Sequence, residues 1–309
     1  LRASAAGGRV EAMTLLTIKN REASRRRPQR AAEPMQMTLG SSVTLEGTGL
    51  HGGGKARVVI HPAPEHSGIV FSGGGCEMPG LVSSVVDTSR GTTIGLNGSR
   101  VRTIEHLMAA LRGKGIDNAY VEVHGAETPA LDGSAGPYVE AIDSAGLVEQ
   151  SAPRKPVTIS EPVCVQSNGS FILAVPASEL RITYVMSYDH PLIGSQTATY
   201  ALREADFGEE LAPARTFVLY EEVAGLLDNQ LARGGSLDNV IVVWQDRMSS
   251  DLRFPNELVR HKLVDLVGDL ALVGGLLHAE VLAVKSGHTL NVEFAREVSR
   301  RNGGSYTNA

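Results

Sequence analysis

The segment RHKLVDLVGDL, at positions 260–270, places a histidine, a lysine and two aspartates among leucine, valine and glycine. In a helix, His261 and Asp265 are one turn apart, so both side chains can reach one cation. Two ligands do not complete a metal site, and an exposed polar helix face would also explain this pair. However, such a face is usually richer in Lys, Glu and Gln, and Gly268 beside the pair permits another element to approach closely.

A third ligand is available in the segment TIEHLMAAL, where Glu105 precedes His106. Neighbouring helix residues point about 100° apart, so one can bind a metal while the other addresses the water that the metal activates. A single histidine is more often a core or capping residue. Together, His106, His261 and Asp265 offer three nitrogen and oxygen ligands and leave one position open, as catalytic zinc requires.

Both segments are predicted to be helices. In the second one, apolar residues recur at i, i+4, i+7, i+8 and i+11 and form one face: Val259, Leu263, Leu266, Val267 and Leu270. His261, Asp265 and Gly268 lie opposite this face, and Lys262 and Asp269 lie at its edge. The segment 255–275 is therefore expected to be an amphipathic helix that carries its ionisable groups on one side.

The rest of the chain divides into two α+β halves, 37–150 and 157–300, joined by a linker at 151–156. Each half runs through strands, a helix, a strand and a closing helix, and each contains an Asn-Gly pair, at 97–98 and 168–169, that predicts a hairpin. When EHLMAAL is aligned with RHKLVDL, His106 falls on His261. This alignment suggests a duplicated α+β unit.

Length and composition predict a two-domain cytoplasmic protein. The chain has 309 residues, 42% of them hydrophobic, and can bury a large core. It contains no run of eighteen apolar residues, so we expect no membrane span. Cys76 and Cys164 match neither a zinc spacing nor a disulfide framework, as is usual in a reducing compartment. We also expect a monomer.

Charge is unevenly distributed along the chain. The net charge is −5, but residues 1–36 carry seven Arg and one Lys against three Glu, which is +5 and leaves −10 for the remainder. An acidic body argues against nucleic-acid binding. We interpret residues 1–36 as a disordered or artefactual extension before a natural start near Met35 or Met37, with a transit peptide as the alternative. Residues 301–309 are expected to be a tail.

Six blocks, in the order in which they occur, resemble the UDP-3-O-acyl-N-acetylglucosamine deacetylases, the zinc amidases of lipid A biosynthesis. The blocks are TIEHLMAAL, LDGSAGPY, ARTF, GGSLDN, LRFPNELVRHKLVDLVGDL and KSGHTLN. The resemblance covers roughly residues 37 to 300 and is far more specific than any single motif. It implies two similar α+β domains in a layered sandwich, with helices packed between the sheets and a βαβ insert at about 217–245 that forms an acyl tunnel.

The resemblance also implies residue roles and a substrate, an acylated UDP-N-acetylglucosamine whose N-acetyl group is hydrolysed. His106, His261 and Asp265 would bind Zn²⁺, or Fe²⁺ in the cell. Glu105 would be the general base, and His288, paired with Asp269, the general acid. The remaining roles would be oxyanion stabilisation, by Thr216 and Lys262, and substrate binding, by Phe217, Lys285 and Leu227.

Simpler interpretations of some residues remain open. Thr216 and Phe217 could be turn and core residues, Lys285 could be solvated, and LDGSAG could only cap a helix. The Gly-rich stretch around His51 completes no phosphate-binding pattern and could merely turn. Two other functions also remain: a zinc hydrolase of another amide or peptide, and a non-catalytic protein that binds a sugar nucleotide or an acyl chain.

Overall fold

The computed structural model describes residues 34–202 and 206–303. Most of the predicted extension, and the end of the predicted tail, therefore lie outside the described residues. The fold begins before Met37, because strand β1 (Met35–Leu39) pairs with β10 (Leu147–Pro153). The predicted α+β class is confirmed. No helix of the described part of the chain is long and apolar enough to cross a membrane.

The first half contains a five-stranded sheet of order β2-β3-β9-β4-β5. Its central strand β9 is antiparallel to β3 and parallel to β4. Alternate residues of these strands are buried, which gives the sheet one face toward the core. The strands are β2 (Val43–Thr48), β3 (Lys55–Pro62), β4 (Ile69–Gly73), β5 (Cys76–Pro79) and β9 (Ala119–His124).

The second half repeats this topology in the order β12-β13-β18-β14-β15, with β11 (Val157–Thr158) also paired to β18. Its central strand β18 is again antiparallel to one neighbour and parallel to the other. The strands are β12 (Val163–Ser167), β13 (Ser170–Pro176), β14 (Leu180–Ser187), β15 (Ser195–Ala201) and β18 (Leu277–Val284). The matching strand order confirms the predicted duplication.

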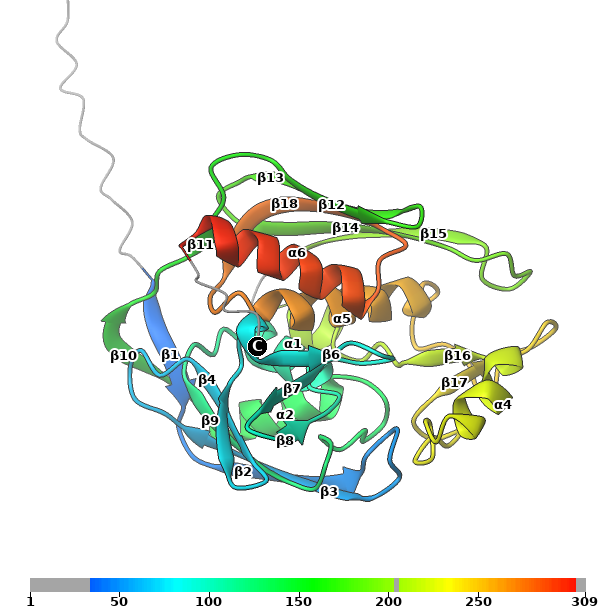
Figure 1. Cartoon of the computed structure of the whole chain (residues 1–309), viewed down its shortest axis with the longest axis horizontal. Helices are drawn as coiled ribbons and strands as arrows, with labels where there is room; N and C mark the ends of the chain where they lie inside the picture. Colours follow the sequence, from blue (N-terminus) through cyan, green and yellow to red (C-terminus); the bar gives the residue numbers. More distant parts are fainter. Residues whose placement is uncertain (1–33, 203–205, 304–309) are drawn as a thin grey trace, which may run out of the picture. The chain divides into compact units, whose positions relative to one another are not determined.

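Helices of both halves lie between the two sheets (Figure 1). In each half one helix precedes the central strand and another follows it: α1 (Glu105–Gly113) and α2 (Gly136–Ala145) around β9, and α5 (Glu257–Ala271) and α6 (His288–Arg301) around β18. Helix α1 packs directly on α5. The two helices that carry the predicted metal ligands are thus paired in the interior.

Both the apolar face and the polar face of helix α5 are buried. Its apolar residues pack in the core, and its polar face meets α1. The approach is close at Gly268, where an added Cβ would lie 2.0 Å from the backbone oxygen of Glu105. His261, Asp265 and Asp269 are therefore buried and Lys262 is half-buried, so a solvated surface does not explain these polar residues.

Two tight hairpins form where the Asn-Gly pairs predicted them. Residues 97–98 join β7 (Thr93–Leu96) to β8 (Ser99–Val101), and β6 (Val85–Asp87) completes that three-stranded sheet. Residues 168–169 join β12 to β13. All four turn residues have positive φ, as type I′ turns require. The short helices η1 (Val82–Ser84) and α3 (Phe207–Glu210) lie in connections.

The segment predicted as an insert forms a βαβ unit. Strand β16 (Phe217–Leu219) leads into α4 (Tyr220–Asp228), and β17 (Ile241–Val243) pairs with β16 in parallel. This unit extends from the side of the layered body in Figure 1. The proposed linker at 151–156 begins inside β10, because that strand continues to Pro153 along β1.

Candidate metal centre and active site

Three potential metal ligands from α1 and α5 meet between the sheets. Nε2 of His106 lies 3.5 Å from Oδ1 of Asp265, and Nε2 of His261 lies 3.3 Å from the same oxygen. Tetrahedral zinc, with bonds of about 2.1 Å, separates its ligands by about 3.4 Å. All three residues are buried. Their donor atoms and spacing fit a divalent transition metal with one position left open.

Neighbouring groups orient these ligands. Nδ1 of His261 donates to the carbonyl oxygen of Ala214 at 3.0 Å, which leaves Nε2 for a metal. Burial lowers the pKa of His261 to about 4, although Asp265 opposes it, so the imidazole is neutral as ligation requires. Burial acts to raise the pKa of Asp265, but His261 and Lys262 hold it well below its usual range. Asp265 is therefore a carboxylate.

Lys262 contacts this carboxylate from the side away from the histidines. Its Nζ donates to Oδ2 of Asp265 at 2.7 Å, whereas Oδ1 faces the two imidazoles. Burial acts to lower the pKa of Lys262, but Asp265 raises it, and the net shift is upward. A permanent cation thus lies at the edge of the metal cluster, where it can stabilise negative charge that develops on a substrate oxygen.

Glu105 lies next to the ligand His106 and is almost completely buried. Its Oε2 accepts a hydrogen bond from the backbone N–H of Thr92 at 2.9 Å, and its Oε1 lies 3.9 Å from Nε2 of His288. Burial raises the pKa of Glu105, although His288 and His106 act to lower it. A carboxylate of raised pKa is a stronger proton acceptor, which suits a general base.

His288 begins helix α6 and is held by a buried carboxylate. Its Nδ1 donates to Oδ2 of Asp269 at 2.9 Å, and Asn291 donates to the same oxygen at 2.9 Å. The hydroxyl of Thr92 donates to the other oxygen of Asp269 at 2.5 Å. Burial acts to lower the pKa of His288, but Asp269 and Glu105 raise it to about 9. His288 is therefore an imidazolium at neutral pH.

These groups border a cavity of about 350 Å³. The structure brings every sequence-predicted residue except Asp269 and Leu227 to its wall, and Asp269 lies behind His288. The predicted residues in the wall are Glu105, His106, Thr216, Phe217, His261, Lys262, Asp265, Lys285 and His288. The cavity thus combines a cluster of candidate metal ligands, a buried carboxylate of raised pKa, an imidazolium and two lysines.

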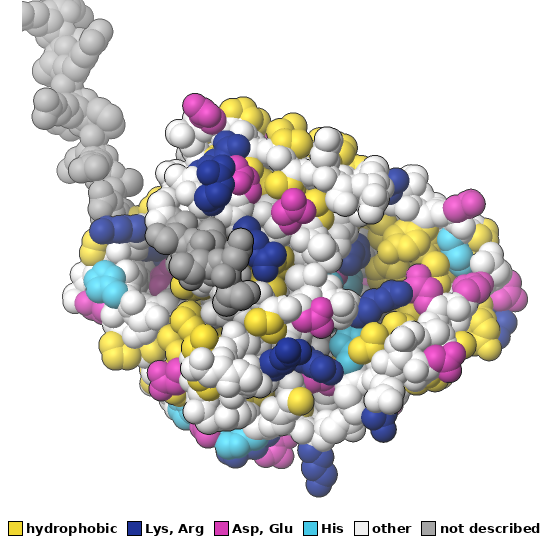
Figure 2. Space-filling model, viewed as in Figure 1, with side chains coloured by type: hydrophobic (Ala, Val, Ile, Leu, Met, Phe, Trp, Pro, Cys, Tyr) yellow, Lys and Arg dark blue, Asp and Glu magenta, His cyan; other side chains and the backbone are white. Residues whose placement is uncertain are grey.

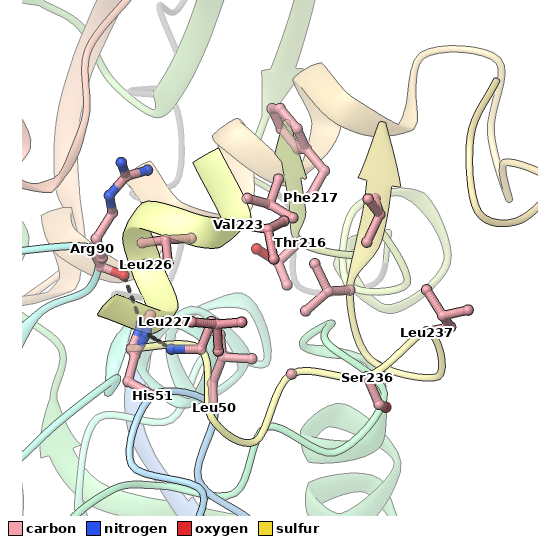
Figure 3. A pocket seen from close by; sticks show the side chains of 15 residues that line it. Leu50, His51, Arg90, Thr216, Phe217, Val223, Leu226, Leu227, Ser236 and Leu237 are labelled. Carbon is pink, nitrogen blue, oxygen red and sulfur yellow. Dashed lines mark hydrogen bonds between the residues drawn. The ribbon is translucent and has the colours of Figure 1, made fainter. Parts of the chain in front are cut away.

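A second cavity, of about 360 Å³, lies beside the first, between the insert and the turn at 49–53 (Figure 3). Its wall is mostly apolar and includes Leu226 and Leu227 of α4, and Leu227 is 51% exposed. Phe217 and Thr216 line both cavities. Hydrophobic side chains are also visible on this side of the molecule in Figure 2, next to basic and histidine side chains. An apolar chain attached to a polar group could occupy both spaces.

The Thr216 segment is held by helix α5. Arg215 makes a two-pronged ion pair with the buried carboxylate of Glu257, at 2.8 and 3.1 Å, and its backbone N–H donates to the same group at 3.0 Å. One turn further along α5, His261 contacts Ala214. The residue before Thr216 is therefore fixed to the helix that carries two of the three candidate metal ligands.

The sequence analysis missed several contributors to the site. Asn291 follows His288 at i+3 on one helix face, a spacing that suggests contact with the same partner. Thr92 carries no such signal, because it reaches Glu105 and Asp269 only through the folded chain. Arg90 lines both cavities and is likewise brought there by the tertiary structure.

Comparison with known proteins places this site within a known family. Residues 36–300 match the family described as UDP-3-O-acyl N-acetylglycosamine deacetylase. The chain is 42% identical over 271 residues to the UDP-3-O-acyl-N-acetylglucosamine deacetylase of Myxococcus xanthus, which covers 85% of this chain and 86% of that protein. The chain belongs to this deacetylase family. The family resemblance predicted from the sequence is therefore confirmed.

Other relatives in the deacetylase family show similar agreement. The enzyme of Chlamydia caviae is 41% identical over 272 residues, covering 86% of this chain and 97% of that protein. The enzyme of Leptospira biflexa is 40% identical over 265 residues, covering 84% and 88%. The matched family region includes both cavities, from Leu50 to His288.

Proposed function

We propose that this protein hydrolyses the N-acetyl group of a UDP-3-O-(3-hydroxyacyl)-N-acetylglucosamine, giving the free amine and acetate, an early step of lipid A biosynthesis. The proposal follows from family membership together with a site built for amide hydrolysis. The apolar cavity beside the polar one favours an acylated sugar over a peptide. A purely binding protein would not need an acid and a base beside a metal-ligand cluster.

We propose Zn²⁺ as the metal, with Fe²⁺ as the alternative, held by His106, His261 and Asp265. When bound, this ion supplies Lewis-acid chemistry that favours attack by water and polarises the amide carbonyl. Two nitrogens and one oxygen with an open fourth position are a usual donor set for catalytic zinc. The neutral state of His261 and the ionised state of Asp265 favour ligation.

The remaining residues of the site transfer protons or stabilise the negative charge that forms during the reaction. Glu105 accepts a proton from the attacking water, because burial raises its pKa and so makes it a stronger proton acceptor. His288 donates a proton to the departing nitrogen, since Asp269 keeps the imidazole protonated. Lys262 and Thr216 stabilise the negative oxygen that forms when water adds to the carbonyl.

The observation that carries this proposal is the pairing of Glu105 with His288. Oε1 of Glu105 lies 3.9 Å from Nε2 of His288, beside the candidate metal ligands. Burial raises the pKa of Glu105, which suits a proton acceptor, and Asp269 raises the pKa of His288 to about 9 against the effect of burial, which suits a proton donor. Amide hydrolysis needs such a pair, because water must lose a proton and the leaving amine must gain one. The substrate-binding roles of Phe217, Lys285 and Leu227 follow from their places in the cavity walls.

Acetate release from the acylated UDP-sugar tests the proposal directly. The parent protein should deacetylate this substrate but not a set of acetylated peptides. Glu105→Gln should reduce turnover by roughly 10²- to 10⁴-fold while the metal stays bound. Turnover of peptides instead of the sugar, or full turnover by Glu105→Gln, would contradict the proposal. We further propose that the enzyme is a monomer in the cytoplasm, which size-exclusion chromatography and cell fractionation would check.

A further inference from the structure

The Gly-rich turn at 49–53 is part of the wall of the apolar cavity. Leu50 and His51 line that cavity, opposite the side chains of α4 (Figure 3). The turn belongs to the first half of the chain, whereas α4 and the segment that follows it belong to the insert in the second half. The position of one relative to the other therefore determines the width of the cavity.

The buried carboxylate of Glu127 holds the backbone of the turn. Oε2 of Glu127 accepts hydrogen bonds from the backbone N–H groups of His51, at 3.2 Å, and Gly52, at 3.0 Å. Glu127 is only 1% exposed. At Gly49 an added Cβ would lie 2.1 Å from this same oxygen, so the residue must be glycine for the carboxylate to approach. Glu127 thus fixes the backbone of the turn without reaching either cavity.

The segment returning from α4 docks on this turn through its backbone. The N–H of Arg233 donates to the carbonyl oxygen of His51 at 3.1 Å, and the N–H of Gly234 donates to that of Leu50 at 3.0 Å. An added Cβ at Gly234 would lie 2.2 Å from the carbonyl oxygen of Gly49. The two backbones are therefore in direct contact, and no larger residue at position 234 fits between them.

The His51 ring joins the docked segment to a third part of the wall. Its Nε2 donates to the carbonyl oxygen of Arg90 at 3.0 Å, and its Nδ1 accepts from the N–H of Ala232 at 3.4 Å (Figure 3). The Arg90 side chain then pairs with Glu222 of α4 at 2.6 Å. Hydrogen bonds and an ion pair thus join the turn, the segment at Arg90 and the insert in the walls of the two cavities.

We propose that Glu127, acting through the turn at 49–53, is a positioning residue that holds the insert against the first half of the chain and so sets the acyl-chain preference of the enzyme. This inference rests on the proposed deacetylation of a 3-O-acylated substrate. Release of the docked segment widens the apolar cavity and removes contacts with the far part of a long acyl chain. The candidate metal ligands lie on α1 and α5, outside this turn, and Glu127 and Gly234 line neither cavity, so we expect the metal-ligand cluster to stay intact.

Gly234→Ala tests the inference by forcing the two backbones apart. Deacetylation is measured with two acylated UDP-sugars that differ only in the length of the 3-O-acyl chain, one long and one short. Each methylene that loses its apolar contact reduces binding about fourfold, so kcat/KM for the long chain should fall at least about tenfold. The short-chain substrate should keep its parental kcat/KM, and bound zinc should be unchanged.

Gly225→Ala on α4 is the matched control, because an added Cβ there meets no atom within 4 Å. It makes the same chemical change in the same insert and should leave both substrates unaffected. Coincident chain-length profiles for the two variants would overturn the inference, as would an equal loss with both substrates. Failure of the parent protein to deacetylate either substrate would instead contradict the proposed function.

A second pair of variants tests the role of the Glu127 carboxylate itself. These variants test the inference even if Gly234→Ala does not fold. Glu127→Ala removes the acceptor of both turn N–H groups, whereas Glu127→Gln keeps an oxygen in that place. The alanine variant should lose kcat/KM selectively for the long chain, and the glutamine variant should restore the parental profile. A Glu127→Ala protein with the parental chain-length preference would refute the positioning role.

Discussion

Replacing Asp269 by asparagine isolates the negative charge that keeps His288 protonated. The asparagine oxygen can occupy the place of Oδ2 and accept from His288 and Asn291, while its amide group faces the Thr92 hydroxyl, which can also accept. The hydrogen-bond geometry is therefore retained and only the charge is lost. Any change in the pH profile then reports the electrostatic effect of Asp269.

The expected shift is large. The pKa of His288 is raised to about 9 in the parent, despite the opposing effect of burial. Without the Asp269 charge it should fall to about 6.5, the ordinary value, or lower, which corresponds to roughly 3 kcal/mol lost by the imidazolium. At pH 7.5 the protonated fraction then drops from about 97% to about 9%. Turnover should fall about tenfold at this pH.

A pH series of kcat/KM gives the sign of the effect. The active form of His288 is the protonated one, so activity is lost as pH rises through its pKa. The basic limb should lie near pH 9 in the parent and move down by about two units or more in Asp269→Asn. Asp143→Asn, which removes a surface charge paired with Lys114, is the control and should leave the limb in place. An unmoved basic limb in Asp269→Asn would refute the reasoning.

Three further substitutions test packing, the ion pair beneath Thr216 and the acyl cavity. Gly268→Ala should lower both the melting temperature and the zinc affinity, because its Cβ would lie 2.0 Å from the Glu105 backbone oxygen; an unchanged melting curve and zinc titration would contradict this. Arg215→Met should cost about 3–5 kcal/mol in urea unfolding, because it leaves the buried Glu257 carboxylate without its cation, and a loss below about 1 kcal/mol would count against it. Leu227→Trp should alter the chain-length dependence of kcat/KM, since Leu227 lines the apolar cavity; identical profiles would exclude that role.

Local features of the fold were predictable because short-range chemistry determines them. The Asn-Gly pairs at 97–98 and 168–169 predicted tight hairpins, since both turn positions need positive φ. The helix that carries His261 was predicted from its apolar periodicity, and TIEHLMAAL, which carries His106, was also predicted to be helical. Their alignment also predicted the duplication, which the matching strand orders confirm.

Long-range features were not predictable by the same reasoning. A helical wheel gives two faces to α5 but does not show that α1 covers the polar one. The burial of His261, Asp265 and Asp269 therefore appears only in the fold. The contacts of Thr92 with Glu105 and Asp269 join residues far apart in sequence. The Gly-rich turn at 49–53 likewise looked like a simple turn, because its partner Glu127 is distant in the chain.

Metal binding by ligand variants tests the central claim of a metal-dependent deacetylase most directly. Zinc content and acetate release are measured together on the parent protein, His261→Ala and Asp265→Ala, before and after chelation and zinc addition. The parent should bind one equivalent of zinc through His106, His261 and Asp265, lose activity with the chelator and recover it on zinc addition. Both variants should lose most of the zinc and the activity. Full zinc stoichiometry in both variants, or full activity in metal-free parent protein, would contradict the account.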